Sequence, residues 1–270
     1  MAPSTICLIN QKGGCGKSSL CFHLAGAFAQ AGLNVLLIDA DPQGSLSQGF
    51  FGSEFVEALP AELTVAALLD ADSSAFGEEW VVQNSRFDQI AICPANAHLA
   101  PFNTPTPETT GLGQYALREF VDRQSDVDVI LIDCPPNLYR CSWAAMLASA
   151  WCLIPVPPED FGTQGLRAVH QAIEQARLLN PRLECLAHIV TRSDKRLLVH
   201  RSYEQRLREL YGDRVLETVI PELSAFKVAL ACRQPVGFFN PKSTAAVLTN
   251  TLAREIFDRI AMSNTRRNVA

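Results

Sequence analysis

Several features that would mark other classes of protein are missing from this 270-residue chain. None of its nine cysteines forms a Cys-x-x-Cys pair, the spacing that is typical of zinc and iron–sulfur sites. The N-terminus has no basic segment followed by a long apolar one, so we expect no secretory leader. We therefore expect free thiols in a reducing compartment rather than a disulfide framework.

Long uncharged runs are also scarce. The longest, Cys141 to Pro158, reaches membrane-spanning length only by including two serines and three prolines. We interpret it as a helix followed by a buried strand, because proline interrupts helices. The net charge of −5 argues against a wholly basic nucleic-acid-binding protein, but it says nothing about a local basic face. With 48% hydrophobic residues, the chain has enough apolar material for one large domain.

A glycine-rich turn stands near the N-terminus, between an apolar run at 5–9 and a helical pattern at 20–25. In a strand–turn–helix of this kind, backbone N–H groups and the helix N-terminus face an anion, and glycine permits its close approach. We expect Lys17 to reach the β- and γ-phosphates of a nucleotide and Ser18 to bind Mg²⁺. The residues expected around the phosphates are Gly13, Gly14, Cys15, Gly16, Lys17, Ser18 and Ser19.

A second apolar run, residues 35–38, ends in two aspartates, Asp39 and Asp41. Acids at the carboxyl end of a parallel strand face the ligand crevice. Because these two flank one alanine, they should project to the same side of an extended chain and repel each other unless a cation or proton lies between them. Hydrated Mg²⁺ would be such a cation. The alternative is that the Asp-Pro pair merely ends a strand.

A third apolar run, residues 129–132, ends in Asp133, the pattern of a Walker B strand. We expect Asp133 to hold Mg²⁺ through water. Further strands are predicted at 152–156, 189–191 and 219–221, alternating with helices. This alternation predicts an α/β fold: a single domain with a twisted, mostly parallel sheet and helices on both faces.

The connecting segments give weaker signals. Residues 44–62 are interpreted as a mobile connection, 63–69 as a short helix and 90–92 as a short strand. The proline-rich segment 101–113 is expected to be a loop that is solvated or contacts a partner. The last helix is expected at about 244–260, with Val247, Leu252, Ile256 and Ile260 facing the core.

A basic helix is predicted after residue 198, with Val199, Tyr203, Leu207 and Leu210 on its apolar face. Residues 192–214 carry a net charge of +3 in a chain of −5. One interpretation is a patch that contacts the DNA backbone, and the other is a solvated helix with ion pairs such as Glu204–Arg208. The residues alone favour the second interpretation. The cations concerned are Arg192, Lys195, Arg196, Arg201, Arg206, Arg208 and Arg214.

The turn departs from the ordinary P-loop pattern, which requires glycine where this chain has Gln11. Its Lys-Gly-Gly-x-Gly-Lys-Ser string, with the extra Lys12, resembles the deviant Walker A motif of the ParA/MinD superfamily of P-loop ATPases. The Asp-x-Asp-Pro-Gln-Gly string at 39–44 and the segment at 153–166 resemble the ParA branch. The resemblance extends from Ile6 to about Ile260. The chain departs from the pattern at Gln164, where the family has glutamate, and again at 222–230.

This resemblance implies a slow ATPase, stimulated by a partner, with ATP and Mg²⁺ as cofactors. In the family, the residue matching Lys12 contacts the nucleotide of the partner subunit in an ATP-bound homodimer. By the same resemblance, Asp41 would orient or activate the attacking water, Asp39 would support the metal site, and Pro221 would pack near adenine. Non-specific duplex DNA would bind basic residues of the C-terminal region, for which the candidates are Arg192, Lys195, Arg196, Arg201, Arg208 and Lys227.

The implied role is partition of a plasmid or chromosome with a ParB-like partner, in a cytoplasmic, nucleoid-associated protein. We divide the chain into an ATPase domain at 1–262 and a short polar tail at 263–270. The tail has two arginines but no large apolar face, so we expect none of the membrane targeting of MinD-type relatives. Two alternatives remain: a ParA-like ATPase that positions another cargo, such as a protein organelle or receptor cluster, on the nucleoid, and an ATP-dependent synthetase on the same fold.

Overall fold

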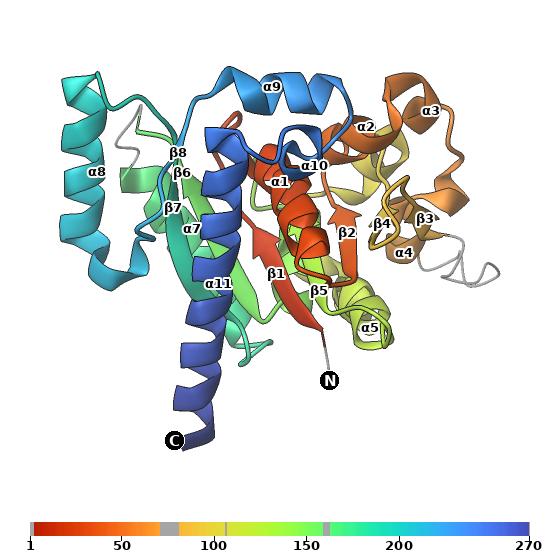
Figure 1. Ribbon diagram of the computed structural model, residues 1–270. Coiled ribbons are helices and arrows are strands. Elements are labelled where there is room, and N and C mark those ends of the chain that lie inside the picture. Colours follow the sequence, from red (N-terminus) through yellow and green to blue (C-terminus); the bar gives the residue numbers. More distant parts are fainter. Residues whose placement is uncertain (1–2, 71–80, 106, 159–162, 270) are drawn as a thin grey trace.

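The computed structural model describes residues 3–70, 81–105, 107–158 and 163–269 (Figure 1). Their strands form one eight-stranded sheet in the order β3-β4-β2-β5-β1-β6-β7-β8. All neighbours pair in parallel except β3 and β4. The strands are β1 (Ser4–Leu8), β2 (Val35–Asp39), β3 (Gln83–Asn84), β4 (Ile90–Cys93), β5 (Val129–Asp133), β6 (Trp151–Val156), β7 (Glu184–Ser193) and β8 (Ile220–Pro221).

Helices cover both faces of this sheet, as the alternating sequence pattern predicts. The helices are α1 (Lys17–Gln30), α2 (Ser45–Phe51), α3 (Ser53–Glu57), α4 (Val65–Leu69), α5 (Ala116–Asp122), α6 (Arg140–Ala148), α7 (Thr163–Arg177), α8 (Leu198–Tyr211), α9 (Ser224–Ala231), α10 (Val236–Phe239) and α11 (Thr244–Val269). Short 3₁₀ segments lie at Ala61–Leu63, Ala97–Phe102, Pro107–Tyr115 and Gly212–Arg214.

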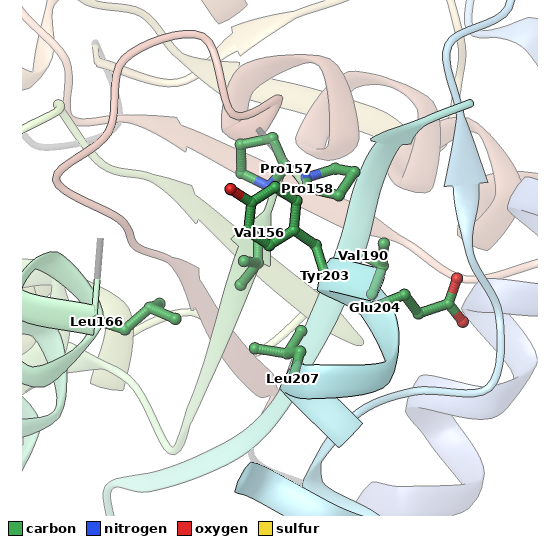
Figure 2. Close-up of a pocket in the computed structure, with 8 residues that line it drawn as sticks. All are labelled: Val156, Pro157, Pro158, Leu166, Val190, Tyr203, Glu204 and Leu207. Atoms are coloured by element: carbon green, nitrogen blue, oxygen red, sulfur yellow. The ribbon is translucent and has the colours of Figure 1, made fainter. Parts of the chain in front are cut away.

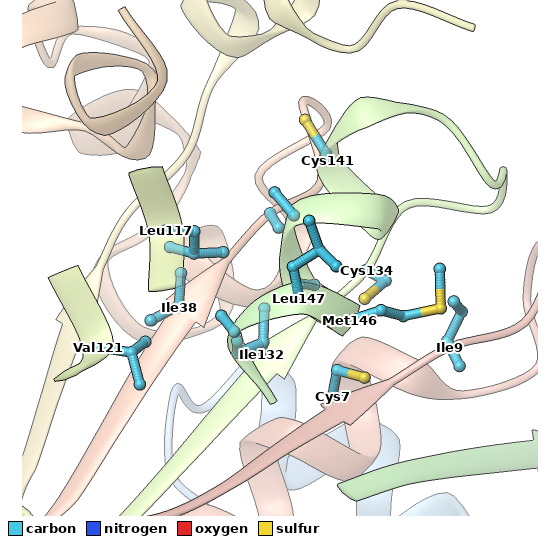
Figure 3. Packing of buried hydrophobic residues seen from close by; sticks show 14 of the residues in the cluster. Cys7, Ile9, Ile38, Leu117, Val121, Ile132, Cys134, Cys141, Met146 and Leu147 are labelled. Carbon is cyan, nitrogen blue, oxygen red and sulfur yellow. The ribbon is translucent and has the colours of Figure 1, made fainter. Parts of the chain in front are cut away.

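Alternate residues of the central strands supply two separate cores. Ile6 and Leu8 of β1 pack with α1 and α11 on one face of the sheet. Cys7 and Ile9 pack on the other face, in the core that includes α5, α6 and α7 (Figure 3). Because both faces are buried, the strands are continuously apolar rather than alternating. These apolar runs made the strands visible in the sequence.

The strand order places the ligand-binding edge next to β1. The chain passes from β1 to β2 on one side of this strand, and later crosses from β5 to β6 on its other side. In parallel α/β sheets, such a switch point opens a crevice at the carboxyl ends of the strands. In the register, Leu8 pairs with Asp133 and Asp133 with Asp39, so the glycine-rich turn and both aspartates stand at one edge.

The prediction of a mobile connection at 44–62 is wrong. This segment forms α2, α3 and a 3₁₀ turn, and the side chains of Leu46, Ser47 and Val56 are buried. The Asn96 side chain donates hydrogen bonds to two of its carbonyls, those of Val56 and Leu59. The abundance of glycine and serine suggested mobility, but distant partners order the segment. Likewise, 3₁₀ helices occupy parts of 101–113, which was expected to be a loop.

Helix α8 buries only part of its predicted apolar face. Val199 and Leu210 are 50% and 53% exposed, whereas His200 and Leu207 are buried. Figure 2 shows the inner side, where Leu207 and Tyr203 face Val156 of β6 and Val190 of β7 around a pocket of about 20 Å³. Of the predicted stripe, Tyr203 and Leu207 thus face the sheet, whereas Val199 and Leu210 at its two ends are exposed.

Helix α11 differs in two respects from the prediction. It continues to Val269, so most of the predicted polar tail is helical. Leu252, Ile256 and Ile260 face the core, but Val247 is 55% exposed. Within the described ranges, no helix is both long and apolar enough to span a membrane. Residues 159–162 of the family-like segment lie outside the described residues, as does the side chain of Gln164.

Candidate nucleotide site

The glycine-rich turn between β1 and α1 has the conformation of a phosphate cradle. Gly14 and Gly16 have φ angles of 71° and 96°, in the left-handed region that residues other than glycine rarely adopt. Gly16 is the N-cap of α1, and because it has no side chain it cannot cap the N–H groups of the first helical turn. The free N–H groups at this helix end are therefore directed toward a ligand.

The ammonium group of Lys17 lies folded against the turn. Its Nζ donates to the carbonyls of Asn10 at 3.1 Å and Lys12 at 3.4 Å, and the side chain is only 6% exposed. A positive charge is thus held beside the cradle by hydrogen bonds to backbone carbonyls. Lys17 begins α1 directly after Gly16, which is the position expected for a phosphate-binding lysine.

Two neighbouring strands hold the turn from outside. Asn10 donates its side-chain amide to the Pro155 carbonyl of β6 at 2.7 Å and accepts the Lys12 N–H at 3.0 Å. From β7, the Thr191 hydroxyl donates to the Cys15 carbonyl at 2.8 Å, and Arg192 donates to the Gly14 carbonyl at 2.9 Å. These bonds engage carbonyl groups on the outside of the turn. The N–H groups on the inside of the turn therefore remain available to a ligand.

Asp39 and Asp133 are completely buried at the ends of adjacent strands. Asp39 is well satisfied: it accepts the hydroxyl and the N–H of Ser47 at 2.6 and 2.9 Å, and the N–H of Asp41 at 3.2 Å. By contrast, neither carboxylate oxygen of Asp133 has a hydrogen-bond partner among the described residues. Such an orphaned buried acid requires a proton or a cation.

Burial raises the pKa of both acids. The pKa of Asp39 rises to about 7, mainly through loss of hydration, against the opposing hydrogen bonds from Ser47. Burial also raises the pKa of Asp133 well above its usual range, and the nearby charge of Asp39 raises it further. Ser18 and Lys17 act in the opposite direction on the pKa of Asp133, so both lie close to its carboxylate.

These residues fit a hydrated Mg²⁺ ion. Within the part of the chain that the structure describes, no three His, Cys, Asp or Glu side chains gather as a metal-ligating group. Mg²⁺ requires no such group, because it keeps several waters and binds one or two carboxylates with substrate phosphates. Asp133 and the Ser18 hydroxyl are suitable oxygen donors, and Asp39 lies behind them, oriented by Ser47.

Asp41 lies two residues beyond the end of β2. It is 8% exposed, and its Oδ1 accepts the Gln43 N–H at 3.0 Å, which forms a tight turn. The negative charge of Asp41 raises the pKa of both Asp39 and Asp133, so the three acids influence one another electrostatically. Asp39 is the last residue of β2, whereas Asp41 lies in the turn that follows the strand.

A cleft of about 260 Å³ begins at the glycine-rich turn and extends toward β8 and α9. Pro221 lines it, as the family resemblance implies for a residue near the base. Leu20, Phe226 and Leu230 are among the apolar side chains that line it beside polar ones. A flat, partly apolar base would find in this cleft the contacts that such sites usually provide.

The six cations predicted to contact DNA do not form one surface. Lys195, Arg196 and Arg201 are exposed in and just before α8, and Arg196 pairs with Asp194 at 2.7 Å. Arg208 instead pairs with Glu204 at 2.9 Å and donates to the Leu216 carbonyl. Arg192 and Lys227 line the cleft beside the glycine-rich turn. The prediction that these residues contact DNA therefore rests chiefly on the three near the start of α8.

Comparisons with known proteins agree with this geometry. A family model described as an AAA domain matches residues 3–185. The chromosome-partitioning ATPase Soj of Thermus thermophilus is 32% identical over 256 residues, which cover 94% of this chain and 96% of Soj. The chromosome partitioning protein ParA of Caulobacter vibrioides is 31% identical over 94% of each chain. This chain belongs to the ParA-type ATPase family.

Solved structures share the ParA-type fold at lower identity. One is a putative plasmid partition protein from Borrelia burgdorferi bound to AMPPNP, with 20% identity and a TM-score of 0.77 over 97% of this chain and 99% of that one. Another is cobyrinic acid a,c-diamide synthase from Mycobacterium smegmatis with ADP and magnesium, with 24% identity and a TM-score of 0.75 over 93% of each chain. These likenesses show the fold alone, so function must be argued from the site.

Some residues that build this ParA-type site were not predicted. Ser47 orients Asp39, yet it lies in the segment that was interpreted as mobile. Asn10 and Thr191 hold the glycine-rich turn, and Thr191 was recognised only as a strand end. A polar residue directly after the buried Ile189 and Val190 was the available signal for Thr191, since such positions face the crevice.

Thr191→Val is expected to weaken nucleotide binding by roughly 5- to 10-fold. The change removes the hydroxyl that holds the Cys15 carbonyl and leaves that carbonyl unpaired, at a cost of about 1 kcal/mol or more. Thr251→Val is the matched control, because the Thr251 hydroxyl bonds only within its own exposed helical turn, to the Val247 carbonyl. Titration calorimetry with ADP measures both variants. Equal affinities would show that the bond does not support the cradle.

Proposed function

We propose that this chain is an ATPase that binds ATP with Mg²⁺, dimerises around the nucleotide and then binds duplex DNA without sequence preference. The observation that carries the proposal is the orphaned, buried Asp133 beside a left-handed glycine cradle. A buried acid that lacks hydrogen bonds is costly, and a phosphate-bound Mg²⁺ ion would remove that cost. Family membership and the two partition relatives support this assignment.

Each residue of the nucleotide site has its own role in hydrolysis. The N–H groups from Gly13 to Ser19 hold the phosphates, and Lys17 turns from the loop carbonyls to neutralise the β- and γ-phosphates. Ser18 and Asp133 hold the metal, with Asp39 in support. Asp41 positions water for in-line attack on the γ-phosphorus. Bound Mg²⁺ supplies charge stabilisation to the transferring phosphoryl group.

ATP would then control DNA binding through dimerisation. Lys12 of each subunit contacts the nucleotide of the other, so that ATP joins two subunits and brings together two copies of Lys195, Arg196 and Arg201. Doubling the phosphate contacts strengthens binding and steepens its dependence on salt. Hydrolysis, slow alone and stimulated by a ParB-like or cargo-adaptor partner, releases the DNA. This cycle would place the protein in the cytoplasm on the nucleoid, where it segregates a plasmid or chromosome.

Binding to random duplex DNA tests this proposal. We expect salt-sensitive binding with ATP and none with ADP, retained in Asp41→Ala, which traps the ATP state, and lost in Lys12→Ala. Reversing the charges of Lys195, Arg196 and Arg201 to glutamate should reduce affinity at least 10-fold, since each removes a phosphate contact. The matched control reverses Arg177 and Arg182, which lie at the opposite, amino-terminal edge of β7.

If no nucleotide state binds DNA, the partition function is refuted and α8 is simply a solvated helix. The structural likeness to a diamide synthase makes a substrate-dependent synthetase the second candidate. ATP turnover that requires an added small carboxylic acid would support the synthetase. Nucleotide-dependent DNA binding with a non-ParB partner would support positioning of another cargo.

A further inference from the structure

Three charged side chains line the otherwise largely apolar cleft beside the glycine-rich turn: Arg192, Glu222 and Lys227. They form a continuous chain of contacts. Glu222 accepts a hydrogen bond from Lys227 Nζ at 2.7 Å, and its other oxygen lies 3.6 Å from Arg192 Nη2. Arg192 Nη1 in turn donates to the Gly14 carbonyl. The position of Glu222 is thus linked to the turn that is proposed to hold the phosphates.

The backbone of Arg192 suggests that this link has a function. Its φ angle is 53°, in the left-handed region, although it is not glycine. Such a residue costs about 1 kcal/mol or more and persists only where its surroundings hold it. Here the conformation accompanies a side chain that joins the turn to Glu222. The contacts of the guanidinium group with the glycine-rich turn and with Glu222 offset this backbone strain.

Glu222 has a defined charge. The hydrogen bond from Lys227, and then the charge of Arg192, hold the pKa of Glu222 below its usual range. The side chain is therefore a carboxylate at neutral pH, and a carboxylate can only accept hydrogen bonds. Lys227 can only donate them. The cleft consequently presents one acceptor and one donor within 2.7 Å of each other.

We propose that Glu222 and Lys227 select adenine by reading one edge of the purine base. The adenine edge carries the N6 amino donor beside the N7 acceptor, whereas guanine and hypoxanthine present two acceptors, O6 and N7. Glu222 accepts from N6, and Lys227 donates to N7. A lysine alone would favour an O6/N7 edge, so the carboxylate is the residue that determines specificity. This assignment rests on the proposed function, in which the base of ATP occupies the cleft.

Arg192 is a positioning residue in this scheme. It holds Glu222 at a set distance from Gly14, and therefore sets the distance between the base edge and the phosphates. The region in which the chain departs from the family pattern, residues 222–230, contains both reading residues. Selection of the base by this charged pair is thus a property of this chain's own residues.

Binding of ADP and IDP tests the proposal, because on the edge that carries N7 the two differ only in having N6 or O6, and neither is turned over. Titration calorimetry with Mg²⁺ should show that the wild type prefers ADP by roughly 5- to 50-fold. The lower part of that range applies if water screens the pair, since the Lys227 side chain is 73% exposed and that of Glu222 is 39% exposed. Glu222→Ala should remove or reverse the preference, because Lys227 then donates to O6 of IDP.

Three further variants separate reading of the base from general damage. Glu222→Gln keeps an acceptor but adds a donor, so it should give an intermediate ADP/IDP ratio. Arg192→Ala should weaken the binding of both nucleotides and also lower the ratio, which damage to the glycine-rich turn alone would not do. The control, Glu217→Ala, removes a carboxylate that is 88% exposed outside the cleft lining and should leave the ratio unchanged.

An unchanged ratio in Glu222→Ala, with ADP still bound, would overturn the proposal while leaving the nucleotide site intact. Failure of the wild type to bind either diphosphate would refute the proposed ATPase function itself. The two failures are therefore distinguishable in one series of titrations.

Discussion

Lys17→Ala is expected to lower affinity for ATP at least 10-fold and to reduce hydrolysis at least 100-fold, whereas Lys12→Ala should leave affinity for ADP within about 2-fold. Lys17 is buried at the first position of α1, with its ammonium group at the mouth of the cradle. Its loss removes the charge that stabilises the transferring phosphoryl group, a contribution of about 3 kcal/mol or more. Steady-state phosphate release and nucleotide titration measure the two effects.

The comparison with Lys12 is a matched one, because the two lysines flank the same glycine-rich turn. The Lys12 side chain is half-buried and is proposed to act on the nucleotide of a second subunit. Lys12→Ala should therefore bind ADP as a monomer but fail to form the ATP-dependent dimer in sedimentation experiments. If Lys12→Ala loses ADP affinity to the same extent as Lys17→Ala, Lys12 acts on its own subunit's nucleotide and the dimer scheme is wrong.

Asp133→Asn is expected to stabilise the nucleotide-free protein while abolishing hydrolysis that depends on Mg²⁺. The wild-type carboxyl is buried without a hydrogen-bond partner among the described residues, and burial raises its pKa well above its usual range. Folding therefore favours the protonated carboxyl, and keeping it neutral costs about 1.4 kcal/mol for each unit by which the pH exceeds the unfolded pKa. Asparagine carries no such cost, but it gives the metal no anionic ligand.

The pH dependence of this effect has a definite sign. A group whose pKa is raised by folding favours the folded state most below its unfolded pKa, and that stability is lost as the pH rises through the folded pKa. For Asp39 the window runs from about 4 to about 7, since its pKa rises to about 7. The nucleotide-free wild type should therefore lose stability across this window, and Asp133→Asn should lose less.

Urea unfolding at pH 5, 6 and 7, with and without Mg²⁺ and ADP, measures this difference. The stability gap between Asp133→Asn and the wild type should widen with pH in the nucleotide-free protein, and bound Mg²⁺ with nucleotide should close or reverse it. Asp128→Asn is the control, because Asp128 has its carboxylate in an exposed hydrogen bond to the Asn34 N–H. A variant at Asp133 that is less stable than the wild type at every pH would contradict the assignment of an uncompensated buried acid.

The strands and the nucleotide motif were predicted from sequence because their signals are local. An apolar run that stops at Asp39 or Asp133 identifies both a buried strand and the edge at which its acid stands. The turn from Gly13 to Lys17 likewise carries its glycine spacing within a few residues. Family resemblance was informative for the same reason, since it rested on these short strings, and the ParA-type assignment was confirmed.

The tertiary structure decided which residues support that motif. Thr191 and Cys15 are 176 positions apart, and their hydrogen bond exists only because β7 and β1 lie on either side of β6. Ser47 reaches Asp39 because residues 44–62 fold into helices. The hydrogen bond from Asn96 that holds this segment has no local signal in the sequence. The same is true of Arg192 and Glu222, which meet at the cleft. The sequence by itself determined the strands, the phosphate cradle and its acids, since each depends on neighbours in the chain. The order of the strands decided what surrounds them, because contacts between distant residues depend on how the sheet is assembled.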